Sequence, residues 1–135
     1  MGMNLVLGRY SITADGDQTM QHFIGLDGAV CGAGEKALGV LEFDVDDTEQ
    51  ATVICPGSIA TVIAGDVVAA KAAVTSDATG RAVEADDLTT AAGAVAVLAD
   101  AATPTFEGGV LPQAINGYAL EAAAAAGDLI RVLLV

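Results

Sequence analysis

The densest group of side chains that could do chemistry is a run of carboxylates, "EFDVDDTE", from Glu42 to Glu49. Closely spaced acidic side chains bind Ca²⁺ in an EF-hand loop. This run lacks the glycine at the sixth position and the spaced terminal glutamate that such a loop requires. We therefore interpret it as a solvated hairpin turn and expect no metal site there.

The other residue types that support catalysis are few and scattered. His22 is the only histidine, which excludes a multi-histidine metal centre, and no nucleophile motif accompanies it. Cys31 and Cys55 lack the CxxC spacing of a metal or redox site. The glycines of "GAGEKALG", from Gly32 to Gly39, match neither a P-loop nor a dinucleotide fingerprint. We expect no catalytic residues, no cofactor and no enzyme activity.

Composition limits the classes of partner. Eighteen acidic residues against five Lys and Arg give a net charge of −13, which repels phosphate backbones and disfavours nucleic-acid binding. No apolar run reaches the ~18 residues of a membrane span. The start of the chain lacks the pattern of a signal peptide, and two cysteines are too few for a disulfide framework. We expect a soluble protein made in the cytoplasm, with no membrane partner and with reduced thiols.

The elements that would position these residues are short strands. β-branched runs bounded by glycine or aspartate predict strands at Asn4–Ile12, Gln21–Leu26, Ala37–Val45 and Gln50–Cys55. The later runs "SIATVIAG", "AVTSDATGRAVEA", "GAVAVLA" and "GGVLPQAI" predict more. Turn signals every 8–12 residues are typical of barrels and sandwiches. The predicted fold is all-β, a small β-barrel or β-sandwich of short antiparallel strands with at most one or two short helical turns.

Two segments have helical character. Gly65–Val74 could form a turn or two of helix capped by Asp66. The alanine run Ala122–Ala126 favours a helix by propensity, but Gly127 ends it after five residues and nucleating so short a helix is costly. We predict a small-residue turn there that leads into a closing strand, Leu129–Val135, which is too apolar to hang free.

A weak internal repeat crosses the chain. Each copy has an Asp–Gly turn, a strand that begins with glycine and ends in glutamate, and a return strand, which places Glu42 and Glu121 at related positions. The second copy carries extra residues. We therefore expect one β-rich domain, residues 1–135, with a possible insertion at 86–113.

The strings "AGD…AAVTSDATGRAV" and "GYALEAAAAAGDLIRVLL" resemble those of the capsid decoration, or cement, proteins of tailed bacteriophages. The resemblance covers Gly57–Ala85 and Ile115–Val135. It implies a structural virion protein, assembled in the host cytoplasm. Such a protein would bind the capsid exterior and bridge and stabilise major capsid protein subunits.

The expected partners are the major capsid protein and further copies of the chain, as a dimer or trimer, because exposed strand edges tend to be covered and decorators act on symmetric lattice sites. Within "TPTFEGGVLPQ", the apolar residues Phe106, Val110 and Leu111 are candidates for contact with a neighbour. Arg9, Arg81 and Arg131 are cations that could pair with acidic capsid groups, with Arg131 expected on the outward face of the last strand.

Two alternatives stand beside this hypothesis. One is a small acidic β-domain that recognises a peptide or a carbohydrate on another assembly, although the shortage of aromatic residues argues against sugar stacking. The other is an enzyme that uses the acidic run or His22, for which the scattered acids give no convergent pocket.

Overall fold

The computed structural model describes residues 4–86 and 113–135, and in these ranges the chain forms nine strands and no helix. The all-β prediction is confirmed. Phe106, Val110, Leu111, the predicted strand "GAVAVLA" and most of "GGVLPQAI" lie outside the described residues. The strands are β1 (Arg9–Thr13), β2 (Phe23–Gly25), β3 (Ala37–Leu41), β4 (Gln50–Ile54), β5 (Ile59–Ile63), β6 (Ala73–Ser76), β7 (Ala82–Glu84), β8 (Gly117–Ala119) and β9 (Leu129–Leu134).

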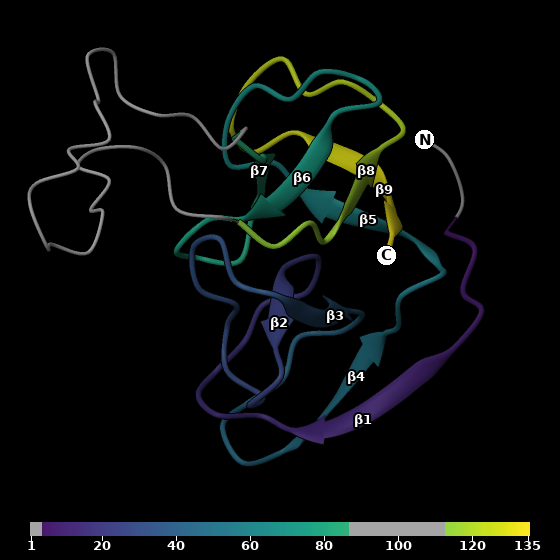
Figure 1. The fold of residues 1–135 in the computed structure, drawn as a ribbon. Helices are drawn as coiled ribbons and strands as arrows, with labels where there is room; N and C mark the ends of the chain where they lie inside the picture. Colours follow the sequence, from purple (N-terminus) through teal and green to yellow (C-terminus); the bar gives the residue numbers. More distant parts are fainter. Residues whose placement is uncertain (1–3, 87–112) are drawn as a thin grey trace, which may run out of the picture.

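The strands form two curled antiparallel sheets, one above the other in Figure 1. The first sheet has the order β1-β4-β3-β2, and the second has the order β5-β9-β8-β6-β7. We call strands β1–β4 the first unit and strands β5–β9 the second unit. Strands β1, β4, β3 and β2 correspond in order to β5, β9, β8 and β6, and β7 extends the second sheet beyond β6. The chain therefore contains the same four-stranded arrangement twice.

Irregular positions repeat as well as strands. In the first unit, Gln18 and Val45 exchange two backbone hydrogen bonds of 2.8 and 3.0 Å. In the second unit, Val68 and Ala123 exchange the same two bonds, of 3.1 and 2.8 Å. Matching hydrogen bonds outside the strands show that the repeat extends to the loops.

Unusual backbone angles occupy matching places too. Gln21 and Lys71 have φ of 65° and 71°. The Gln21 N–H donates to the carbonyl of Leu41, the last residue of β3, and the Lys71 N–H donates to that of Ala119, the last residue of β8. A non-glycine residue with positive φ is uncommon. Its recurrence at the same place in both units supports the internal repeat predicted from sequence.

The alignment of the two glutamates is wrong by one residue. The Glu42 N–H donates to the Thr52 carbonyl, and the equivalent bond in the second unit runs from the Leu120 N–H to the Arg131 carbonyl. Leu120 therefore matches Glu42, and Glu121 matches Phe43. The sequence-based alignment failed because both strands end in glutamate but at registers that differ by one residue, which in a strand means opposite faces.

The core follows this division. One buried cluster lies within the first unit and contains Ala14, Ile24, Leu41, Val45, Ala51 and Val53. The other fills the second unit and also includes residues of the first unit, namely Phe23, Cys31, Ala37, Val40 and Ile54. These five residues join the two units into one packed structure.

The alanine run is a turn, as predicted. The Asp128 carboxylate accepts hydrogen bonds from the N–H groups of Ala124 and Ala125 at 2.8 and 3.1 Å, and Gly127 has φ of 94°. Strand β9 then runs between β5 and β8, so the prediction of a paired closing strand is confirmed.

The helical alternative at Gly65–Val74 is wrong. Asp66 does accept a hydrogen bond from the Val67 N–H at 2.7 Å, but Val68 is buried and forms a bridge with Ala123. Pairing with a distant segment outweighs a helix of one or two turns, which has little intrinsic stability. Among the described residues, no helix is long and apolar enough to cross a membrane.

Candidate interaction surface

The acidic run forms the β3–β4 hairpin and supports turns. Asp44 accepts a hydrogen bond from the Met20 N–H at 2.8 Å, and Asp47 accepts one from the Gly16 N–H at 2.8 Å. The hairpin turn predicted for this run is therefore present. In residues 4–86 and 113–135, no group of three or more His, Cys, Asp or Glu is arranged to hold a metal ion.

His22 lies beside backbone carbonyls rather than beside a nucleophile. Its Nδ1 lies 3.0 Å from the Met20 carbonyl and 3.2 Å from that of Thr19. A shallow hollow of about 230 Å³ opens next to it between the two units, lined by Asp17, Gln18, Thr19, His22, Val30, Ala78 and Thr79. Within it, the Gln18 side chain donates to the Asp15 and Gly28 carbonyls, both at 3.0 Å.

The most distinctive surface is one face of the second sheet, which we call the outer face. Strands alternate their side chains, so the residues that point away from the core of β5, β9 and β8 share this side. They align in register across the sheet: Ile59 pairs with Leu133, and Leu133 pairs with Tyr118. The apolar members of the outer face are Ile59, Ile63, Tyr118, Leu120, Leu129 and Leu133.

These apolar side chains are open to solvent. Tyr118 is 44% exposed, Leu120 43%, Leu129 41% and Leu133 37%. Neighbouring exposed apolar side chains mark a candidate place of contact. In a chain of net charge −13, it is also a surface where another protein can approach with little repulsion.

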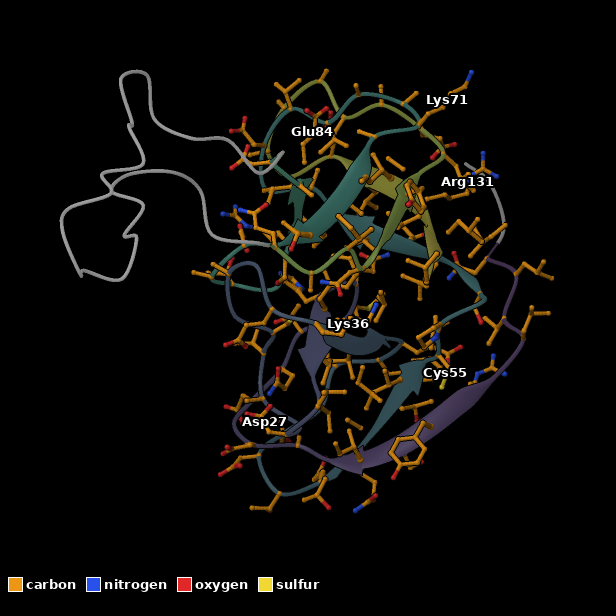
Figure 2. All side chains as sticks on the ribbon, in the orientation of Figure 1. Asp27, Lys36, Cys55, Lys71, Glu84 and Arg131 are labelled. Carbon is orange, nitrogen blue, oxygen red and sulfur yellow. The ribbon has the colours of Figure 1, made fainter. Side chains whose placement is uncertain are left out.

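The charges on the outer face balance each other. The guanidinium of Arg131 donates from Nε and Nη2 to Glu121 Oε1 at 3.0 and 2.7 Å, and the Arg131 N–H donates to Glu121 Oε2 at 3.2 Å. These hydrogen bonds lower the pKa of Glu121. Arg131 projects outward from β9, as predicted (Figure 2), but its charge is neutralised within the chain.

The internal repeat shows how the first unit uses the same face. The row Ile59, Leu133 and Tyr118 matches the row Arg9, Ile54 and Val40 of the first unit. Ile54 and Val40 are 2% and 1% exposed, because they pack in the core that joins the units. Two positions of the outer face, those of Leu133 and Tyr118, are thus the counterparts of residues buried where the units meet, whereas Arg9, the counterpart of Ile59, is exposed.

The other predicted cations are also paired. Arg9 donates to Glu42 from Nε at 2.7 Å and from Nη2 at 3.0 Å. Arg81 forms an ion pair of 2.8 Å with Asp77. Arg9 belongs to β1 and Arg81 to the turn before β7, so the structure does not bring them to one site. An acidic group on a partner would have to compete with these internal carboxylates for the two arginines. The role of Arg9 and Arg81 at an interface stays a prediction.

The sequence analysis missed the outer face although a signal was present. "LIRVLLV" is apolar at almost every position. A strand that is apolar on both sides is typical of a sheet covered on both sides. The closing strand was predicted to be interior or paired, with Arg131 on its outward face, but the exposed leucines of that face were not predicted.

The fold matches a solved structure over almost its whole length. It is similar to "the crystal structure of head fiber gp8.5 N base in bacteriophage phi29", with a TM-score of 0.63 and 20% sequence identity. The match covers 98% of this chain and 95% of that chain. No protein-family model matches the sequence, and neither does any curated protein. At this identity the likeness shows a common fold.

Proposed function

We propose that this protein is a structural component of a phage virion. It binds the outer surface of the assembled head, where it bridges and stabilises major capsid protein subunits without catalysing a reaction. The observation that carries the proposal is the whole-chain likeness in fold to the base of a phage head fiber. The resemblance of Gly57–Ala85 and Ile115–Val135 to capsid decoration proteins supports it independently.

The outer face is the part of the described surface that fits such a contact. It presents apolar side chains around one neutralised ion pair, as the centre of a protein interface does. The counterparts of Leu133 and Tyr118 in the first unit, Ile54 and Val40, are buried in the core that joins the units. We therefore infer that the head surface covers Tyr118, Leu129 and Leu133.

The energy of one such contact is modest. Fully burying a Leu or similar side chain contributes ~1.5–3 kcal/mol, and these side chains are already more than half covered. The remaining gain from four of them is on the order of 3 kcal/mol before the cost of association. Strong attachment then requires several contacts at once, which an assembled lattice supplies and a free subunit does not.

The test is to mix purified protein with expanded heads and, separately, with unassembled capsid subunits, and to measure co-sedimentation. The proposal predicts binding to heads, weak binding to free subunits, and a higher temperature of head disruption when the protein is bound. Equal binding to free subunits, or no binding to heads, contradicts it. Light scattering on the free protein tests the separate prediction of a dimer or trimer.

A further inference from the structure

Strand β1 has an edge that pairs with no other strand in the described part of the chain. It lies at the end of its sheet and pairs only with β4. Only the end of this edge is covered, where the Asp15 N–H donates to the Gly28 carbonyl at 3.1 Å and Gly28 lies against the Thr13 carbonyl. Gly8 accepts a hydrogen bond from Cys55 at 3.0 Å, and Ala14 donates one to Glu49 at 2.8 Å. Because hydrogen-bonded residues alternate in an antiparallel pair, the even-numbered residues of this segment bond to β4. The backbone N–H and C=O groups of Arg9 and Ser11 therefore point outward along the open part of the edge.

The equivalent edge in the second unit is occupied. There, Ile59 and Leu5 exchange two backbone hydrogen bonds of 2.8 and 3.0 Å as an antiparallel bridge, and the Ile63 N–H donates to the Gln21 carbonyl at 3.0 Å. The first unit thus supplies backbone groups that close the edge of β5. The internal repeat shows that this kind of edge accepts extended main chain that runs antiparallel to it.

The side chains beside the open edge of β1 are more exposed than the equivalent side chains of β5. Ala60 and Val62, on the inner side of β5, are both 0% exposed. Their counterparts in β1 are Tyr10, which is 55% exposed, and Ile12, which is half-buried. An added strand on this edge would pair with the backbone and cover the Tyr10 ring at the same time.

We propose that the β1 edge receives an extended strand of the head surface protein, which adds to the first sheet antiparallel to β1. This inference rests on the proposed function and specifies a second contact, on the first unit. Strand addition of this kind gains affinity from main-chain hydrogen bonds and specificity from alternate side chains. One of those side chains would be apolar and lie against Tyr10.

The acidic residues near the end of β1 indicate which charge the added strand should carry. Exposed carboxylates gather where β1 ends and on the facing hairpin, namely Asp15, Asp17, Asp47 and Glu49. In an antiparallel pair, the first residues of the added strand lie beside the end of β1. A Lys or Arg is therefore expected near the start of that strand. A second copy of the chain fits less well, because each copy carries a net charge of −13.

The test variant is Ser11→Pro. Proline removes the outward N–H of Ser11 and leaves the bonds of Tyr10 and Ile12 to β4 intact, and proline is tolerated on edge strands. Ser11→Ala is the matched control, because it keeps the N–H. Because Ser11→Pro loses an interface hydrogen bond and blocks the edge, we expect it to bind heads about tenfold more weakly, and Ser11→Ala to bind as wild type does.

Hydrogen exchange on the wild-type protein gives a readout that does not depend on the variant's folding. The amides of Arg9 and Ser11 should exchange fast in the free protein and slowly on heads. If wild type binds heads but Ser11→Pro binds equally and these amides stay fast, the edge proposal is overturned while the proposed function stands. If the amides become protected in concentrated free protein instead, a second copy occupies the edge and the proposal is also wrong. Absence of wild-type binding overturns the proposed function itself.

Discussion

Val40 and Tyr118 occupy the same position in the two units, yet Val40 is 1% exposed and Tyr118 is 44% exposed. Each pairs with the residue at the same place in the neighbouring strand, Ile54 or Leu133. At these positions the first unit is therefore buried in the core that joins the units, and the second unit is left at the surface. The difference between these two positions locates the candidate interface.

The paired closing strand predicts a sharp contrast between neighbouring residues. Ile130 is 1% exposed in the core and Leu129 is 41% exposed on the outer face. Ile130→Ala should lower the free energy of unfolding by about 2–5 kcal/mol, because it leaves a cavity. Leu129→Ala should lower it by less than about 1 kcal/mol. Urea titrations measure both values, and similar losses for the two variants would show that β9 is not packed as described.

Gly39 is predicted to be irreplaceable by alanine. A Cβ atom at this position would lie 2.0 Å from the Ile54 carbonyl oxygen, which belongs to the backbone and cannot move aside alone. We expect Gly39→Ala to cost about 3 kcal/mol through overpacking. At Gly8 the nearest atom to an added Cβ is the Cys55 Cβ at 3.9 Å, so Gly8→Ala is a matched control with little effect. Thermal unfolding of both variants checks this, and an unchanged midpoint for Gly39→Ala contradicts the close approach of β3 and β4.

Asp77 predicts a pH dependence of stability at the acid end. Burial by itself raises the pKa of this carboxyl, but hydrogen bonds from the backbone and side chains of Arg81 and Thr79 outweigh it and hold the pKa below 3.8. A group whose pKa is lowered by folding stabilises the protein above its unfolded pKa, and that stability disappears as the pH falls through the folded value. The Asp77 carboxylate therefore contributes at neutral pH and not in strong acid.

The variant Asp77→Asn isolates this contribution. The difference in unfolding free energy between wild type and Asp77→Asn should be largest near neutral pH and should shrink below about pH 4. Denaturant titrations at a series of pH values measure it. A difference that stays constant into strong acid would mean that the charge of Asp77 has no role.

The two thiols should differ in reactivity. Cys31 is fully buried, its Sγ donates to the Glu35 carbonyl at 3.5 Å, and burial raises the pKa of its thiol. Cys55 is half-buried. Because the thiolate is the reactive form, a thiol reagent should modify Cys55 first in the folded protein. The fast phase should vanish in Cys55→Ser and persist in Cys31→Ser; the reverse pattern would contradict the described burial.

Local features of the sequence predicted most of the strands. Alternating β-branched runs placed β3, β4 and β5, and the "SDATG" turn placed β6 and β7 on either side of it. Gly127 identified the turn after the alanine run. These predictions succeeded because each depends on residues close in sequence, where backbone preferences act directly.

Features that depend on distant contacts were harder to predict. Val68 belongs to no helix because it forms a bridge with Ala123, which lies far from it in the sequence. Glu42 and Glu121 differ in register because the backbone hydrogen bonds, rather than the matching residue types, set the structural alignment. The outer face requires knowledge of which side of β9 the core occupies. Arg9, Arg81 and Arg131 were predicted as cations, but their internal partners could not be inferred from spacing alone.

The most direct test of the account is head binding by a variant of the outer face. Tyr118→Thr/Leu133→Thr removes two apolar side chains from that face and keeps residues suited to strands. Leu26→Thr/Phe43→Thr is the matched control: it removes one leucine and one aromatic ring from positions of the first unit that are 66% and 62% exposed. The measurement is the affinity of each purified protein for expanded heads. We expect a loss of about tenfold for the outer-face variant and wild-type affinity for the control. Wild-type affinity for the outer-face variant would show that this face does not contact the head.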